Sequence, residues 1–197
     1  MNFLAHLFLS KNNEEILIGN FIADAVKGNK FKNYRPQIQV GIKLHREIDT
    51  FTDNHPIVKK SKKRLNPQYK HYSGVIIDIF YDHYLAKNWN EYSKTPLNVY
   101  AKNIYDLILE NSETFPEKIQ KMIPYMIQYN WLEAYKSIEG IERVLIGMNN
   151  RTKGLSKMNL AIEDLKNNYT YFEKDFKAFF DELIKFTNHK TTVLLKE

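Results

Sequence analysis

Residues 72–89 read YSGVIIDIFYDHYLAKNW, and this stretch decides the fold because it predicts a buried helix that carries carboxylates. On a helix of about 3.6 residues per turn, its aliphatic and aromatic side chains cover nearly the whole circumference, which is typical of a helix inside a core. Asp78 and Asp82 are four residues apart and project side by side. Two like charges in an apolar setting require compensation, and a divalent cation is one way to supply it. His83, next to Asp82, offers a further ligand or a proton carrier.

The segments on either side of this stretch also predict helices, because apolar residues recur in them at helical spacing. Pro36 and Pro56 each stand where a helix begins, and no segment shows the sustained two-residue alternation of a strand. We therefore expect an all-α protein, a single helical bundle domain over residues 1–197. The expected helices are 3–9, 14–26, 36–51, 56–66, 72–89, 96–110, 137–149 and 160–186, with one more that starts at Pro116 and is kinked by Pro124.

The composition narrows the class of protein. A chain of 197 residues without a Gly, Ser or Pro-rich linker fits one well-cored domain. The absence of cysteine excludes disulfides, thiolate metal sites and a cysteine nucleophile, so any metal here must be held by oxygen and imidazole. The apolar stretch 3–9 is too short to span a bilayer and has no basic flank before it. We expect a cytoplasmic protein with no membrane span.

The net charge of +6 favours an acidic partner, which by composition alone could be nucleic acid, an anionic membrane or an acidic protein. Positive charge is densest just after residue 56. A plain solvated surface explains such a run about as well as a docking surface does. The run consists of Lys59, Lys60, Lys62, Lys63 and Arg64.

Six side chains from four expected helices suit a hard divalent cation. Each alone has a structural explanation: a core histidine usually bonds a backbone carbonyl, an aspartate can cap a helix, and a His and an Asp four apart can simply pair. The joint pattern, with carboxylates or imidazoles on four consecutive apolar segments, favours a catalytic metal site. Histidine with several aspartates matches Mn²⁺, Mg²⁺ or Fe²⁺. The six candidates are His6, Asp24, His45, Asp49, Asp78 and Asp82.

Several motifs occur in one order along the chain and resemble those of the acyl carrier protein phosphodiesterase family. The resemblance runs from the first residue through about residue 150. It implies an all-helical, HD-type phosphohydrolase fold, although the histidine–aspartate dyad itself does not occur in the sequence. The motifs are MNFLAHLFLS at 1–10, GNFIAD at 19–24, GIKLHREIDTFTDNHP at 41–56, DIFYDHYLAKNW at 78–89 and GMNNR at 147–151.

The resemblance also implies a reaction: Mn²⁺-dependent removal of 4′-phosphopantetheine from holo acyl carrier protein. The acidic carrier protein, rather than nucleic acid, is then the partner for the basic run. We expect four or five of the six candidate ligands to hold the ion, and His83 or His55 to protonate the leaving oxygen. Arg46 is the candidate to hold the non-bridging oxygens, and Asp53 to orient a histidine.

Two other functions fit the same residues. One is a metal phosphohydrolase of the same type that acts on a nucleotide or another small phosphoester. The other is not an enzyme but a basic helical adaptor for an acidic partner, in which the buried polar groups serve only the structure. An adaptor gains nothing from carboxylates on four buried faces, so the sequence favours an enzyme. The native metal and the oligomeric state stay open at this stage.

Overall fold

The computed structural model describes residues 1–11 and 13–196, and all the regular structure in these residues is helical. The all-α prediction is therefore confirmed. None of the described helices is both long and apolar enough to cross a membrane. The α-helices are α1 (Phe3–Leu9), α2 (Glu14–Ile22), α3 (Pro36–Asn54), α4 (Pro56–Lys62), α5 (Ser73–Lys87), α6 (Trp89–Tyr92), α7 (Leu97–Asn111), α8 (Glu117–Gln128), α9 (Trp131–Ala134), α10 (Ile138–Arg151), α11 (Ala161–Asn167) and α12 (Tyr169–Leu194). Short 3₁₀ helices cover Ala23–Ala25, Gly28–Asn33, Pro67–Tyr72, Ser112–Thr114 and Met158–Leu160.

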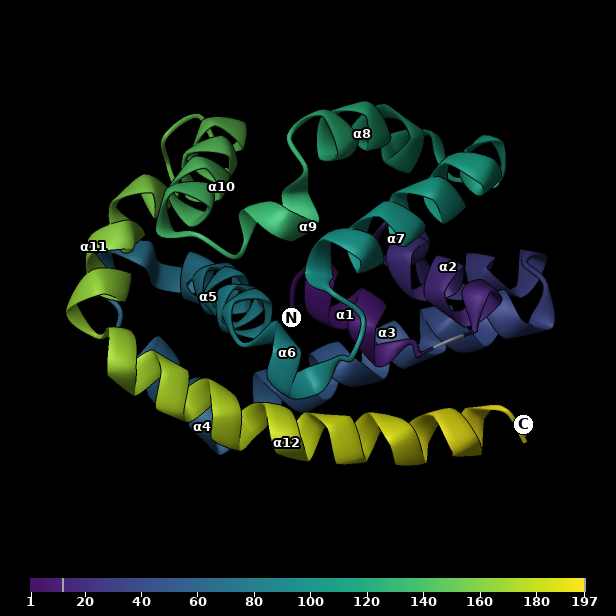
Figure 1. The fold of residues 1–197 in the computed structure, drawn as a ribbon, viewed down its shortest axis with the longest axis horizontal. Coiled ribbons are helices and arrows are strands. Elements are labelled where there is room, and N and C mark those ends of the chain that lie inside the picture. Colours follow the sequence, from purple (N-terminus) through teal and green to yellow (C-terminus); the bar gives the residue numbers. More distant parts are fainter. Residues whose placement is uncertain (12, 197) are drawn as a thin grey trace.

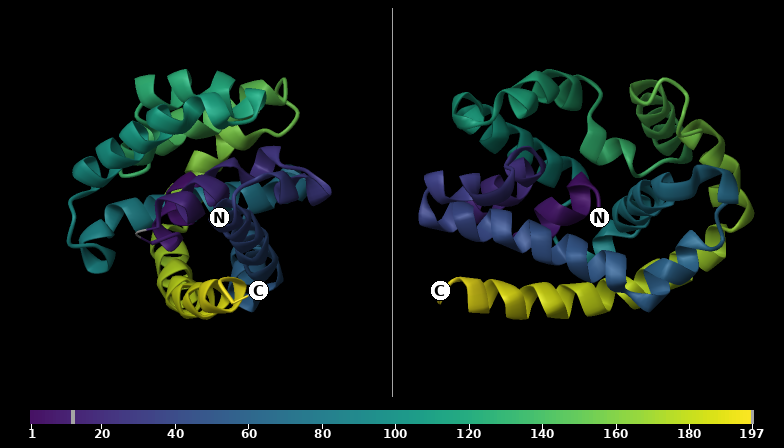
Figure 2. Two further views of the ribbon diagram at one scale, coloured as in Figure 1. Left: turned by 90° about the vertical axis from the view of Figure 1, so that its right-hand side faces the viewer. Right: turned by 180° about the vertical axis from the view of Figure 1, so that it is seen from behind.

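The helices form two sides around a central pair. Helices α3 and α12 lie together along one side, and α7 to α10 lie along the other (Figure 1). Between them α1 packs against α5, and the N-terminus lies near the middle of the molecule in all three views (Figures 1 and 2). This arrangement puts the first residues of the chain, which carry His6, in the interior.

Helix α5 is the buried helix that the sequence predicted. All its aliphatic and aromatic residues from Ile76 to Leu85 are fully buried, and so are Asp82 and His83 among them. The helix ends at Lys87, slightly earlier than expected, because Asn88 leaves the helical conformation before the short helix α6. The expected helix 160–186 is likewise divided at Asn168 into α11 and α12, and the motif at 147–151 forms the last part of α10.

Two glycines let α2 and α3 approach more closely than any other residue would allow. A Cβ atom on Gly19 would lie 2.1 Å from the carbonyl oxygen of Ile38, and one on Gly41 would lie 2.1 Å from that of Ile16. The two backbones are therefore in direct contact at this crossing. The crossing brings Asn20, next to Gly19, against His45, one turn after Gly41.

Candidate metal centre

His6 and His45 form the centre of the site. Their rings come from α1 and α3 and stack with centroids 4.0 Å apart and an angle of 16° between planes. Asp49, one turn after His45 on α3, bridges the Nε2 atoms of the two rings. Its Oδ1 is 3.1 Å from Nε2 of His6 and its Oδ2 is 3.2 Å from Nε2 of His45. One ligand atom from each of these three residues lies within 4.8 Å of the others, so they form a group that could hold a metal ion.

Asn20 fixes the orientation of both imidazoles. Its amide nitrogen donates to the carbonyl oxygen of His6 and to Oγ of Ser10, both at 2.9 Å, so its Oδ1 is the acceptor. That oxygen is 2.9 Å from Nδ1 of His6 and 2.9 Å from Nδ1 of His45, which must both donate. Both Nε2 atoms are thereby directed at the carboxylates, the orientation in which protein histidines bind metals.

Two further aspartates flank the group. Oδ1 of Asp24 is 3.3 Å from Nε2 of His45, and Oδ1 of Asp78 is 3.2 Å from the Met1 amino group, which is also 3.7 Å from Oδ1 of Asp49. The side chains of Asp24, Asp49 and Asp78 are 68%, 43% and 26% exposed. The expectation that these carboxylates are buried was therefore too strong. The group has a closed side, formed by the histidines, and an open side, formed by the aspartates.

The protonation of the group follows from burial and pairing. Burial, together with the nearby charge of His45, lowers the pKa of His6 to about 4. Burial also opposes the charge on His45, but its hydrogen bonds to Asp24 and Asp49 outweigh this and raise its pKa to about 9. Burial disfavours the charge on Asp49 too, yet the hydrogen bond from His45 and the charge of the Met1 amino group hold its pKa well below the usual range. Without a metal, His45 is therefore positively charged at neutral pH and His6 is neutral.

The donor set fits a divalent cation. With the proton of neutral His6 on Nδ1, the lone pair of Nε2 faces Oδ1 of Asp49 across 3.1 Å, and two acceptors so close together suit a shared cation. Separations of about 3 Å are those of neighbouring ligands around an octahedral ion with bonds of about 2.1 Å. His6, His45 and Asp49 are the residues that could hold the ion, with Asp24 and Asp78 next to them.

Asp82 has a different position from the other candidate ligands. It is fully buried, and its two oxygens accept hydrogen bonds from the backbone nitrogens of Asn2 at 3.3 Å, Leu4 at 2.7 Å and Ala5 at 3.3 Å. It therefore caps the first turn of α1 from α5. Burial raises its pKa to about 7, although the Met1 amino group and the Leu4 and Ala5 amides favour the charged form. Its structural effect is to hold α1, and with it His6, against α5.

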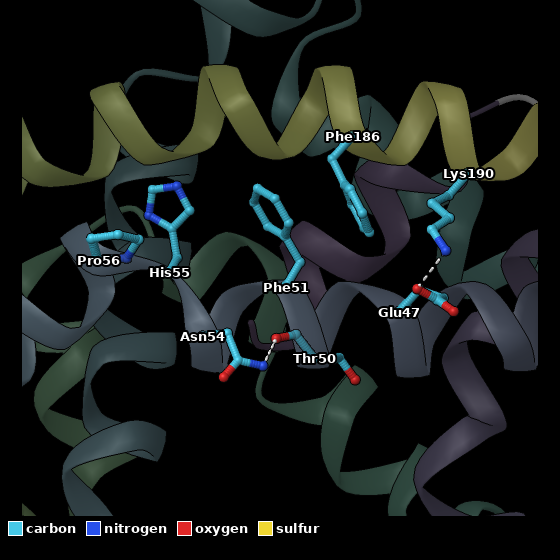
Figure 3. A pocket seen from close by; sticks show the side chains of 8 residues that line it. All are labelled: Glu47, Thr50, Phe51, Asn54, His55, Pro56, Phe186 and Lys190. Carbon is cyan, nitrogen blue, oxygen red and sulfur yellow. Dashed lines mark hydrogen bonds and ion pairs between the residues drawn. The ribbon is translucent and has the colours of Figure 1, made fainter.

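The two histidines expected to transfer a proton lie away from the group. His83 is buried; its Nδ1 donates to the carbonyl oxygen of Tyr135 and its Nε2 lies 2.7 Å from the hydroxyl of Tyr169. His55 caps α4 and pairs with Glu182 at 3.2 Å. It lines a groove between α3 and α12 whose lining residues include no member of the His6–His45–Asp49 group (Figure 3). Neither histidine contacts the His6–His45–Asp49 group.

Arg46 and Asp53 also have contacts that the sequence did not indicate. The guanidinium of Arg46 donates to the carbonyl oxygens of Val26 and Gly28, at 2.9 and 3.0 Å. These hydrogen bonds hold the segment after α2 against α3. Asp53 accepts a hydrogen bond from Lys62 at 2.9 Å and contacts no histidine.

The basic run is divided by its contacts. Lys60 and Arg64 bind the buried carboxylate of Asp175, on α12, at 3.2 and 3.1 Å, and Lys62 binds Asp53. These three side chains connect α4 and the turn that follows it to α3 and α12. Lys59 and Lys63 are exposed and form no ion pair with any described residue. Only these two have the free charge that the sequence suggested for the whole run.

The sequence did not identify Asn20 or Asp175 as residues of structural or functional importance. Both signals were present: each is a polar residue on an otherwise apolar helical face, Asn20 between Leu17 and Phe21 and Asp175 beside Phe176. A single polar residue in such a position usually has only a local partner, so the pattern does not reveal the hydrogen bonds that make Asn20 central to the site.

Comparison with known proteins gives one consistent family. A sequence profile described as acyl carrier protein phosphodiesterase matches residues 1–183. A protein of that name from Yersinia pestis is 32% identical over 191 residues, which are 96% of this chain and 99% of the relative. Another from Photorhabdus laumondii is 31% identical over 191 residues, 96% of each chain. No solved structure matches.

Proposed function

This chain belongs to the acyl carrier protein phosphodiesterase family, and from that premise we propose that it hydrolyses the phosphodiester between 4′-phosphopantetheine and a serine of holo acyl carrier protein. Water adds to phosphorus, the bond from phosphorus to the serine oxygen breaks, and that oxygen gains a proton. The products are the apo carrier protein and 4′-phosphopantetheine. The observation that carries the proposal is the His6–His45–Asp49 group, oriented by Asn20 and open to solvent at its carboxylates.

The site residues would hold Mn²⁺, or Mg²⁺ or Fe²⁺ in its place. The Nε2 atoms of His6 and His45 and the carboxylate of Asp49 are the first ligands, with Asp24 and Asp78 completing the oxygen-rich side. When bound, the ion supplies charge neutralisation at the phosphoryl oxygens and a more acidic water. An HD-type arrangement of helices is part of this proposal. Asp82 is left out of the ligand set, because three backbone amides occupy its oxygens.

Asp24 is the residue best placed to orient the attacking water. It is the most exposed of the three carboxylates, so it can accept a hydrogen bond from a water molecule that approaches the ion from solvent. His45 needs its second proton removed before its Nε2 can bind a cation. The contacts of His55, His83 and Arg46 give these residues packing roles, so the proposal assigns them no part in the reaction.

The open position of the group favours a substrate that is itself a protein. The side chains of Asp24 and Asp49 are 68% and 43% exposed, so a bulky partner can approach the group directly. A nucleotide usually enters a concave pocket that covers most of its surface, whereas a carrier protein brings its phosphodiester to an open surface. Lys59 and Lys63 offer free positive charge for an acidic partner.

The proposal is tested by incubating the Mn²⁺-loaded protein with holo carrier protein and, separately, with a panel of nucleotides and small phosphodiesters. Mass spectrometry of the carrier protein should show loss of the whole phosphopantetheine group, with faster turnover than on any nucleotide. Preferred hydrolysis of a nucleotide would instead favour the small-substrate reading of the same site. No hydrolysis of any phosphoester would favour the adaptor.

A further inference from the structure

Lys62 is a second cation, after the Met1 amino group, near the aspartates on the open side of the metal group. It is the last residue of α4, its side chain is only 24% exposed, and its Nζ donates to Oδ1 of Asp53 at 2.9 Å. Its other neighbour is Gly74, at the start of α5: a Cβ atom built there would lie 3.4 Å from Nζ and 3.6 Å from Cε. The end of the lysine side chain therefore lies against the first turn of α5.

These two contacts locate the ammonium group relative to the site. Asp53 is one helical turn after Asp49 on α3, and Gly74 is one turn before Asp78 on α5. One turn of helix is about 5.4 Å, so the ammonium lies beside the carboxylates that meet at the Met1 amino group.

The ammonium group of Lys62 can exchange Asp53 for another anion at little cost in stability. Asp53 is 72% exposed, and ion pairs with a partner in solvent contribute little net stability. The lysine side chain has four flexible methylene groups, so its ammonium can leave Asp53 for another anion without movement of α4. A phosphodiester held at the metal group would present such an anion within reach.

We propose that Lys62 binds a non-bridging oxygen of the substrate phosphoryl group and exchanges Asp53 for it. This inference rests on the proposed phosphodiesterase function and assigns to Lys62 the role that the sequence suggested for Arg46. It also separates Lys62 from Lys59 and Lys63, the two exposed lysines of the basic run that form no ion pair with a described residue. The ammonium group of Lys62 neutralises negative charge on the phosphoryl group while water attacks the phosphorus atom. Lys62 is not the group that protonates the departing serine oxygen.

The test compares four variants of the Mn²⁺-loaded protein: Lys62→Gln, Lys62→Arg, Asp53→Asn and Lys177→Gln. Lys177 is the matched control, because it forms an ion pair of the same length, 2.9 Å, with Glu91 on other helices. Each variant is titrated with inorganic phosphate in a calorimeter and assayed with holo carrier protein and bis(p-nitrophenyl) phosphate. Circular dichroism checks that each is folded.

Lys62→Gln should weaken phosphate binding and lower kcat/KM on both substrates by roughly tenfold or more, as expected for a lost hydrogen bond to a charged group. Lys62→Arg should keep most of the phosphate affinity and most of the activity. Lys177→Gln should keep the wild-type phosphate affinity and activity. Asp53→Asn breaks the same ion pair but frees the ammonium, so phosphate binding should be retained or tightened.

Equal losses in Lys62→Gln and Asp53→Asn would mean that only the ion pair matters and would overturn the proposal, as would unchanged phosphate binding in Lys62→Gln. If the wild type binds phosphate through Lys62 but cleaves neither substrate, the proposed function fails and the phosphate site stands.

Discussion

Replacement of Asn20 by alanine is the perturbation that separates this account of the metal group from a simple histidine–aspartate cluster. The change removes the amide that orients both imidazoles. His6 Nδ1 loses its only partner, whereas His45 Nδ1 keeps the Asn20 carbonyl at 2.9 Å and Ser10 Oγ keeps the His6 carbonyl at 2.9 Å. A buried donor without a partner lowers the stability by about 2 kcal/mol. Loss of the hydrogen bonds to His45 Nδ1 and to the His6 carbonyl, which keep other partners, adds about 1 kcal/mol.

We therefore expect Asn20→Ala to lower the free energy of unfolding by about 3 kcal/mol, measured by urea titration of the metal-free protein. Because His6 is then free to turn, the affinity for Mn²⁺ should fall by roughly tenfold to a hundredfold, measured by calorimetry. Asn103→Ala, at an exposed position of α7, is the control and should change neither quantity. Mn²⁺ affinity equal to the wild type in folded Asn20→Ala would refute the role assigned to Asn20.

Three further predictions concern helix packing, pH and docking. Gly41→Ala places a Cβ atom 2.1 Å from a backbone oxygen and should destabilise the protein by about 3 kcal/mol in urea unfolding, whereas Gly147→Ala meets nothing within 4 Å and should be neutral or slightly stabilising. The pKa of His45 is about 9 when folded and 6.5 when unfolded, so it stabilises the metal-free protein by about 3 kcal/mol below pH 6.5, and this stability is lost as the pH rises through 9. Mn²⁺ affinity should rise over the same range, because the metal displaces that proton; calorimetry in two buffers that shows no proton release would contradict this. The double variant Lys59→Glu, Lys63→Glu should lower kcat/KM for carrier protein severalfold at low salt and leave bis(p-nitrophenyl) phosphate hydrolysis unchanged, and equal loss on both substrates would remove these lysines from docking.

The fold and the centre of the site were predictable because their signals are local. Helix α1 has the predicted bounds, and α5 is as buried as its composition indicated. The i,i+4 spacing of His45 and Asp49 placed both on one face of α3, where they meet the predicted ligand His6. Spacing within one helix is a geometric consequence of the helix itself and needs no tertiary information.

The rest depends on partners far apart in the chain. Asp82 was expected to bind metal, but the nearest unsatisfied donors are the amides at the start of α1, almost eighty residues earlier, and a helix N-terminus compensates a carboxylate as a cation does. Lys60 and Arg64 were expected to be free, but Asp175 lies more than a hundred residues later. No sequence pattern distinguishes these pairings from solvated charge.

The central claim is that a divalent ion held by His6, His45 and Asp49 is required for removal of phosphopantetheine from holo carrier protein. The most direct measurement follows the mass of the carrier protein during incubation with enzyme that has been stripped by EDTA and verified as metal-free by elemental analysis, before and after addition of Mn²⁺. The account predicts that the mass stays at the holo value until Mn²⁺ is added and then falls to the apo value, and that His45→Ala protein gives no such fall at the same Mn²⁺ concentration. Conversion to the apo form by the metal-free enzyme, or undiminished conversion by His45→Ala, would contradict it.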